Sequence, residues 1–256
     1  MNWQTFMALL GRDVRVARRN FIRVIVLNLL QPMLFVFVFG QVMTRSGLMA
    51  DSYKSLLLPG IIAISMVMSG IQAVAMPLIA EFQFSREIED RLLAPINVRW
   101  LAVEKVVAGM VQAMVAGLVV IPTGWLMMSP GVDLSLRSPM SFLVMALLVA
   151  LFSSAGGLLL GCSVGQTEIG LMFSLVLAPL ISFGCAYYPW SALKAFPILQ
   201  KVVLLNPLVY ASEGLRGSLV PQFQHMPLAV TIAAMAVVDV LIFAFGLAQF
   251  QKKAVS

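Results

Sequence analysis

Six long apolar segments constrain what this chain can fold into more than any other feature of its sequence. A helix that crosses the hydrocarbon core of a bilayer needs about 20 mainly apolar residues. The segments that reach this length are 21–43, 55–80, 101–128, 139–163, 168–188 and 227–249. Only 11% of the residues are charged, whereas a soluble domain carries about 25%. The sequence therefore predicts an all-α polytopic membrane protein with six spans in one transmembrane domain, residues 1–256.

The distribution of basic residues predicts that both termini lie in the cytoplasm. Lys and Arg gather in cytoplasmic loops near the ends of membrane spans. With the N-terminus inside, the inner flanks contain eleven of the 17 basic residues and the outer loops contain six. The net charge of +6 is explained in the same way, so we expect membrane lipid as a partner and no nucleic acid.

Residues 1–20 predict an amphipathic helix that lies in the membrane surface. At about 100° per residue, Trp3, Phe6 and Leu10 share one face of such a helix. The basic residues of the segment are Arg12, Arg15, Arg18 and Arg19. An apolar face opposite arginines is typical of interfacial helices. The alternative is a basic flank that only orients the first span.

Residues 81–96, between the second and third spans, predict a short amphipathic helix on the cytoplasmic side. Phe84, Ile88 and Leu92 recur at helical spacing on one stripe, and Pro95 ends the helix. The charged residues between them are Arg86, Glu87, Glu89, Asp90 and Arg91. Such a helix can bind in a groove of another protein. A solvated connector that packs on its own spans is the alternative.

Residues 189–226 lie outside the membrane in this topology, although much of the segment is apolar. Prolines divide it into pieces that are too short to cross a bilayer. Short apolar pieces of this kind are typical of re-entrant or interfacial segments. We expect two short helices that enter the outer leaflet and gate an exit; a hydrophobic lid that only seals the bundle is the alternative.

Three local motifs resemble the permease subunits of type-2 ABC exporters. Residues 89–96, Glu-Asp-Arg-Leu-Leu-Ala-Pro-Ile, are similar to the end of the family's coupling helix. Residues 205–210, Leu-Asn-Pro-Leu-Val-Tyr, are similar to the asparagine–proline turn between its re-entrant helices. Residues 213–216, Glu-Gly-Leu-Arg, are similar to the acid-and-arginine helix after that turn. The resemblance covers essentially the whole chain.

This resemblance implies a site for each of three roles. The implied ATPase-coupling residues are Phe84, Arg86, Glu87, Ile88, Glu89, Asp90, Arg91, Leu92 and Pro95. The implied connecting-helix residues are Arg12, Arg15, Arg18 and Arg19. The implied gate residues are Asn206, Pro207, Tyr210, Glu213 and Arg216.

The resemblance also implies partners and a location. We expect two permease subunits, as a homodimer, with two copies of a separate ATP-binding subunit, in a prokaryotic cytoplasmic (inner) membrane. The chain contains no Gly-x-x-x-x-Gly-Lys-[Ser/Thr] phosphate loop. We therefore expect it to be no enzyme and to bind no cofactor itself, with ATP and Mg held by the partner. The cargo implied is an amphipathic drug-like molecule, a lipid or a glycoconjugate.

A few residues inside the spans are candidates for the substrate path. Met66, Met68, Met172 and Phe173 lie in the second and fifth spans, which the resemblance places along the path. Flexible methionines suit varied apolar ligands, but lipid-facing filler is the favoured explanation. Asp239 is an ionisable group inside the sixth span, where such groups are costly and often functional. We favour a structural role for it.

Two small features predict packing and capping. Gly157 and Gly161 have the Gly-x-x-x-Gly spacing that allows close helix approach, either within the subunit or across a dimer. Glu168 is expected to cap the N-terminus of the fifth span.

Two other functions remain open at this point. A membrane-embedded enzyme would need polar catalytic groups that converge within the spans, and the sequence offers one deep carboxylate. An ATP-independent secondary carrier or channel would not need the helix at 81–96 to bind anything.

Overall fold

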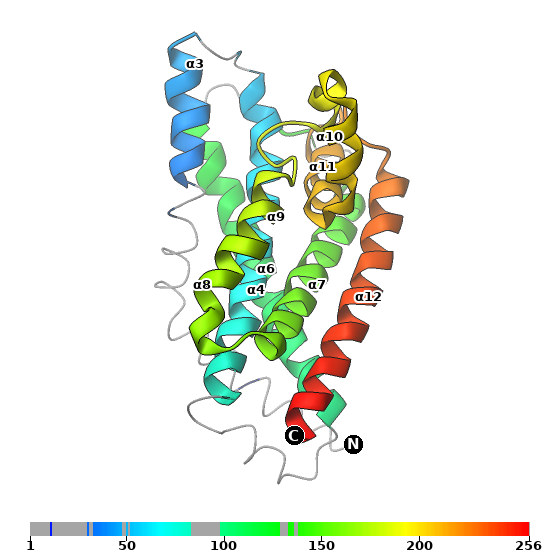
Figure 1. The fold of residues 1–256 in the computed structure, drawn as a ribbon. Helices are drawn as coiled ribbons and strands as arrows, with labels where there is room; N and C mark the ends of the chain where they lie inside the picture. The colour runs from blue at the N-terminus through cyan, green and yellow to red at the C-terminus, as the bar shows by residue number, and fades with distance from the viewer. Residues whose placement is uncertain are drawn as a thin grey trace.

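Four long apolar helices dominate the described part of the chain. The computed structural model describes residues 33–47, 50, 52–82, 98–128, 133–135 and 138–255, together with Gly11 and Leu30, and is helical wherever these residues form regular structure (Figure 1). The four helices are α4 (Tyr53–Ala80), α6 (Val98–Met128), α7 (Pro139–Ser163) and α12 (Leu228–Val255). By length and composition each can cross a membrane. Among the described residues, the predicted all-α architecture with several apolar helices of membrane-spanning length is confirmed.

Helix α4 lies at the centre of the bundle and is buried along most of its length. Its neighbours approach closely through glycine. A Cβ on Gly157 of α7 would lie 2.7 Å from the backbone oxygen of Ile71, and one on Gly161 would lie 3.0 Å from the Cα of Ala75. The Gly-x-x-x-Gly pair therefore packs α7 against α4 within the subunit, which decides between the two alternatives left open by the sequence.

Shorter apolar helices occupy the positions of the first and fifth expected spans. The described part of the first runs over Met33–Arg45 and includes η1 (Val36–Val42) and α3 (Met43–Arg45). The fifth consists of η3 (Gln166–Glu168), α8 (Ile169–Met172), η4 (Phe173–Leu177) and α9 (Ala178–Ser182). The count of six spans stays a prediction.

The fifth helical segment ends at Ser182, although the sequence predicts that the span continues to residue 188. Beyond Ser182 the chain turns, and Cys185 has a φ of 51°. The carbonyl oxygens of this turn do not continue the helix, because side chains from other elements bind them: Ser212 binds Gly184, and Arg216 binds Cys185. Sequence hydropathy cannot distinguish this apolar turn from apolar helix.

Short helical pieces cover one end of the bundle, which we call the α11 end. They are η5 (Trp190–Ala195), α10 (Pro197–Val202), η6 (Val203–Leu205) and α11 (Pro207–Leu219). Figure 1 shows α10 and α11 beside the starts of α4 and α12. Two short helices divided at Asn206 were expected here, and α10 with η6 and α11 match that expectation. Their entry into the outer leaflet stays a prediction.

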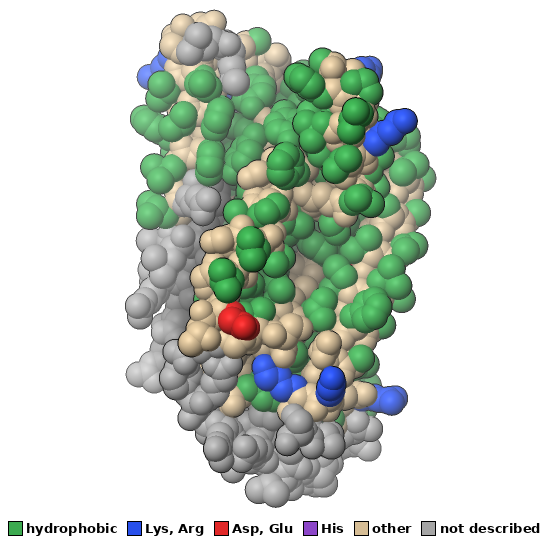
Figure 2. Space-filling view, in the orientation of Figure 1, with side chains coloured by type: hydrophobic (Ala, Val, Ile, Leu, Met, Phe, Trp, Pro, Cys, Tyr) green, Lys and Arg blue, Asp and Glu red, His purple; other side chains and the backbone are tan. Residues whose placement is uncertain are grey.

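The surface shown in Figure 2 has the charge distribution of a membrane protein. Hydrophobic side chains cover its middle, and Lys and Arg side chains lie toward its two ends. Large apolar side chains stand exposed on the helices, among them Leu126 (72% exposed), Leu175 (71%) and Val240 (68%). In water such a surface would drive association, whereas in a bilayer it contacts lipid.

The predicted connecting helix, residues 1–20, lies outside the described residues except for Gly11, and so do residues 83–96 of the predicted coupling helix, 81–96. Glu81 and Phe82, at the end of α4, and Val98, at the start of α6, are described. These points lie at the end of the bundle where α12 finishes, which we call the C-terminal end (Figure 1).

Candidate functional site

A buried ion pair on α11 forms the centre of the candidate gate. Glu213 and Arg216 are three residues apart, which places both side chains on one face of the helix. Their side chains are 1% and 0% exposed, and Arg216 Nη1 donates to Glu213 Oε1. A buried charge needs a partner and further hydrogen bonds to offset its lost hydration. The neighbouring backbone supplies those hydrogen bonds.

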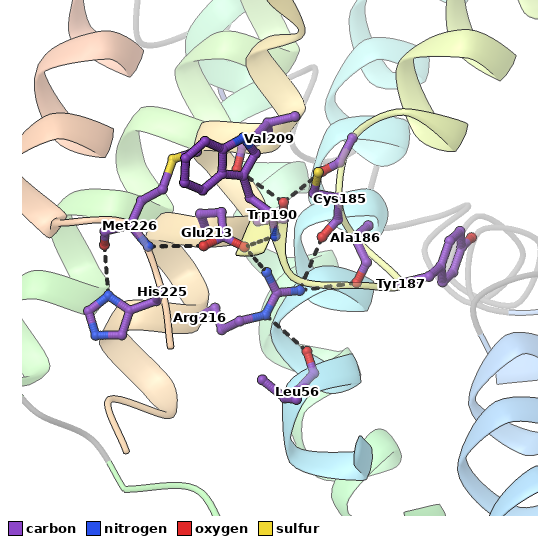
Figure 3. Close-up of polar contacts among 12 residues, drawn as sticks. Leu56, Cys185, Ala186, Tyr187, Trp190, Val209, Glu213, Arg216, His225 and Met226 are labelled. Atoms are coloured by element: carbon purple, nitrogen blue, oxygen red, sulfur yellow. Dashed lines mark hydrogen bonds and ion pairs between the residues drawn. The ribbon is translucent and has the colours of Figure 1, made fainter. Parts of the chain in front are cut away.

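Arg216 binds the backbone of two other elements (Figure 3). Its Nε donates to the Leu56 carbonyl at the start of α4 (3.2 Å), and its Nη2 donates to the carbonyls of Cys185 (3.1 Å) and Ala186 (3.4 Å). The guanidinium therefore joins α11 to α4 and to the turn after α9. Its planar, five-donor geometry suits several fixed carbonyls at once, which a lysine cannot match.

Glu213 accepts hydrogen bonds from the segments on either side of α11. Its Oε1 accepts from the backbone N–H of Trp190 (2.9 Å), and its Oε2 accepts from the backbone N–H of Met226 (3.0 Å). Both carboxylate oxygens therefore have partners. We call Glu213, Arg216 and the backbone groups that they bind the Glu213–Arg216 network.

The turn after α9 also contacts α4 directly. The backbone of Ala186 lies so close to α4 that a Cβ on Gly60 would be 1.8 Å from its carbonyl oxygen. The hydroxyl of Tyr53, in the first turn of α4, donates to the carbonyl of Tyr187. The ring of Tyr187 packs on Phe35, with 4.6 Å between ring centroids. The turn therefore connects the described part of the first expected span to α4.

Burial also sets the chemistry of the thiol in this turn. Cys185 is fully buried, and it forms no disulfide. The thiol is therefore shielded from reagents in the solvent.

The start of α11 is determined by its own sequence. The Asn206 Oδ1 accepts from the backbone N–H of Leu208 (2.9 Å) and caps the helix, and Pro207 occupies the first position, where no N–H is needed. The Asn206 Nδ2 donates to the Leu180 carbonyl in α9 (2.8 Å). Tyr210 donates from its hydroxyl to the Leu204 carbonyl in η6 (2.9 Å). The asparagine–proline turn thus binds α11 to both α9 and η6.

The structure brings together, at the start and along one face of α11, the residues that the sequence selected as a gate. We call these residues the α11 assembly: Asn206, Pro207, Tyr210, Glu213 and Arg216. Sequence reasoning missed the partners Tyr53, Gly60 and Leu56, because two of the three contribute only backbone or a missing Cβ. The Gly60 position after Pro59 in an apolar span was the available signal. The network satisfies its charges internally, so it holds backbone segments in place. A role in gating stays a prediction.

Three of the five candidate path residues are buried inside the subunit. Met66, Met172 and Asp239 are 2%, 3% and 1% exposed, and Met68 is half-buried; the side chain of Phe173 is outside the described residues. Met66 packs against Gly117 of α6, where a Cβ would lie 2.8 Å from its Cγ. Among the described residues, neither carboxylate oxygen of Asp239 has a hydrogen-bond partner. Packing explains Met66 and Met172, and the path assignment stays a prediction.

Glu168 has the local capping contact that the sequence suggested. Its Oε2 accepts from the backbone N–H of Gly165 (3.0 Å), and its own N–H donates to the Gly165 carbonyl (3.1 Å). This pair closes the tight turn between α7 and the fifth helical segment.

The coupling and connecting residues predicted from the sequence lie outside the described residues. They are Arg12, Arg15, Arg18, Arg19, Phe84, Arg86, Glu87, Ile88, Glu89, Asp90, Arg91, Leu92 and Pro95. Their roles stay predictions. Close to them in the described part of the chain, Glu81 at the C-cap of α4 accepts from Lys105 Nζ of α6 (2.7 Å).

Comparison with known proteins identifies the family to which this chain belongs. The sequence pattern described as ABC-2 type transporter matches residues 4–220, which include the whole α11 assembly. The chain is also 25% identical over 238 residues to the "inner membrane transport permease YadH" of Escherichia coli K12, covering 92% of this chain and 90% of that protein. The proteins of the same name from Escherichia coli O157:H7 and Shigella flexneri match equally well. The chain therefore belongs to the ABC-2 type transporter family.

Proposed function

We propose that this chain is the permease subunit of an ATP-driven exporter in the inner membrane of a prokaryotic cell. Two copies form the substrate pathway, and two separate ATP-binding subunits dock beneath them. The observation that carries this proposal is the family match over residues 4–220. The name of the Escherichia coli relative, an inner membrane transport permease, supports the location and the permease role.

The energy for transport comes from the partner in this proposal. The sequence has no phosphate loop of the type that cradles nucleotide phosphates, so ATP and Mg are held by the ATP-binding subunit. The segment 81–96 inserts its apolar stripe, Phe84, Ile88 and Leu92, into a groove of that subunit. The arginines of residues 1–20 keep the adjoining helix at the membrane surface.

At the opposite end, the Glu213–Arg216 network is the fixed part of the gate. It holds α11, the start of α4 and the turn after α9 as one unit, because each is bound through a buried, charge-assisted hydrogen bond. Opening therefore occurs between this unit and its surroundings. The methionine-rich second and fifth spans suit amphipathic cargo, so we favour a drug-like molecule, a lipid or a glycoconjugate.

The test is purification of the chain from its native membrane in mild detergent, followed by mass spectrometry and an ATPase assay. We expect a soluble ATP-binding subunit to co-purify with ATPase activity. Leu92→Asp places a charge in the predicted apolar stripe and should abolish co-purification. Membrane insertion should be retained, because the segment lies outside lipid.

A matched control separates loss of docking from loss of folding. Arg99→Gln removes a charge in the first turn of α6 without touching the predicted stripe, and we expect it to retain the partner. A chain that purifies alone and transports without any ATPase would overturn the proposal and favour an ATP-independent carrier or channel.

A further inference from the structure

The base of the predicted coupling segment is held by side chains from two distant helices. Glu81 caps the C-terminal end of α4, where its backbone N–H donates to the carbonyls of Leu78 and Pro77. Phe82 follows it, and α6 returns at Val98. In the described part of the chain, the two attachment points of residues 83–97 are therefore Glu81 and Phe82 on one side and the start of α6 on the other.

A buried ion pair joins these two attachment points. Lys105 Nζ, on α6, lies 2.7 Å from Glu81 Oε1, and the two side chains are 6% and 11% exposed. Exclusion of water strengthens such a charge-assisted hydrogen bond. The end of α4 and the start of α6 are therefore fastened to each other at the base of the segment.

Phe82 is fastened to the last turns of α12. Its ring meets the ring of Phe250 edge to face, with 6.0 Å between centroids and an interplanar angle of 65°. The ammonium of Lys253 lies over the Phe82 ring, 4.9 Å from its centroid, within the range of a cation–π contact. Phe250 is fully buried. The last turns of α12 thus contact Phe82, at the base of the coupling segment, through the ring of Phe250 and the ammonium of Lys253.

Among the helices that meet at this base, α12 is best suited to carry a displacement. Helix α4 contains Pro77 one turn before Glu81, and α6 contains Pro122; an internal proline removes a helical hydrogen bond and allows bending. Helix α12 runs from Leu228 to Val255 without proline. It reaches α11 at its other end, where a Cβ on Gly214 would lie 3.1 Å from Thr231 Oγ1.

We propose that Phe82, Phe250 and Lys253 form a joint that transmits movement of the coupling segment to α12, which carries it as a stiff rod to the gate helix α11. The Glu81–Lys105 ion pair holds the joint together. This inference rests on the proposed function, since it takes an ATP-binding subunit to move the segment. It assigns positioning roles to the described residues beside the coupling segment and to the last turns of the final span.

The experiment uses the full complex with its ATP-binding subunit in lipid nanodiscs. An environment-sensitive fluorophore is attached at Ala229→Cys, an exposed position at the α11 end of α12. Cys162 and Cys185 are buried, so labelling is directed to the new thiol. The readout is the change in emission when ATP is added.

Lys253→Met is the principal variant, and Lys252→Met is its matched control, because the neighbouring lysine carries the same charge in the same last turn. Loss of a cation–π contact of ordinary strength lowers the equilibrium constant for the contact about two- to fivefold. We expect Lys253→Met to reduce the ATP-driven emission change by about that factor, with the ATP-binding subunit still bound and still hydrolysing ATP. Lys252→Met should leave the signal unchanged.

Phe82→Leu keeps an apolar side chain at the base while removing the ring, and it should reduce the signal at least as much. A full signal in Lys253→Met and Phe82→Leu, with the ATP-binding subunit bound, would overturn the joint and leave the proposed function standing. Absence of the ATP-binding subunit from the wild-type complex would overturn the proposed function, and the joint with it.

Discussion

Removing Arg216 tests the central arrangement of the α11 end. Arg216→Met keeps a long apolar side chain but deletes the charge and every donor to Leu56, Cys185 and Ala186. It also leaves Glu213 as a buried carboxylate without its cation. Breaking a buried ion pair from one side costs about 3–5 kcal/mol.

The lost carbonyl contacts belong to the same network, so their costs do not add independently to that of the ion pair. We therefore expect the free energy of unfolding to fall by about 3–5 kcal/mol in total. The measurement is unfolding in mixed micelles by titration with sodium dodecyl sulfate, followed by tryptophan fluorescence. Lys201→Met, on the exposed surface of α10, is the control and should change stability little.

A double variant separates the charge from the packing. Glu213→Gln combined with Arg216→Met removes the uncompensated charge and retains an acceptor for one of the two backbone amides, Trp190 or Met226, that bind the carboxylate. It should be more stable than Arg216→Met alone by about 1 kcal/mol or more. The buried, coupled pair would be refuted if Arg216→Met lowered the free energy of unfolding by less than ~1 kcal/mol. It would also be refuted if the loss in the double variant equalled the sum of the losses in Arg216→Met and Glu213→Gln measured singly.

Three further predictions concern packing, capping and reactivity. Gly157→Ala should destabilise the bundle by about 1–3 kcal/mol, because its Cβ would overlap the α4 backbone; Gly156→Ala, with its nearest contact at 3.9 Å, should be near neutral in the same titration. Asn206→Ala should cost about 1–2 kcal/mol through loss of the α11 cap, and Asn206→Asp, which keeps the acceptor but loses the donor to Leu180, should cost less. Cys185, which is fully buried, should resist maleimide in the folded protein and react once the chain is unfolded; rapid labelling of the folded protein would contradict its burial.

The long helices were predictable because a single physical requirement produces them. Crossing about 30 Å of hydrocarbon demands about 20 apolar residues in a row, and no local choice of side chain alters that demand. The fourth predicted span, 139–163, matches α7 at both ends, since Pro139 starts the helix and the extended backbone at Val164 ends it. Helix α12 extends beyond the predicted boundary at 249 because Lys252 and Lys253 are good helix formers as well as charged.

The α11 assembly was predictable only in part. Local sequence contains the asparagine–proline cap and the three-residue spacing of Glu213 and Arg216. It therefore predicted the turn and the shared helix face. It did not predict their partners, since backbone carbonyls at residues 56, 185 and 186 have no sequence signature. The fifth span was expected to continue to 188, because an apolar turn and an apolar helix have the same hydropathy.

By itself the sequence determined a polytopic helical membrane protein, because continuous apolar runs of about 20 residues can cross lipid with their backbone paired when they are helical. It also determined where the strongest helix starts lie, because proline and asparagine act within a few residues of their own position. Only the tertiary structure decided which helix faces meet, that Gly157 and Gly161 pack within the subunit, and that Phe82 is held by α12. These contacts join residues far apart in the chain, and their energies depend on close approach and excluded water that no local pattern encodes.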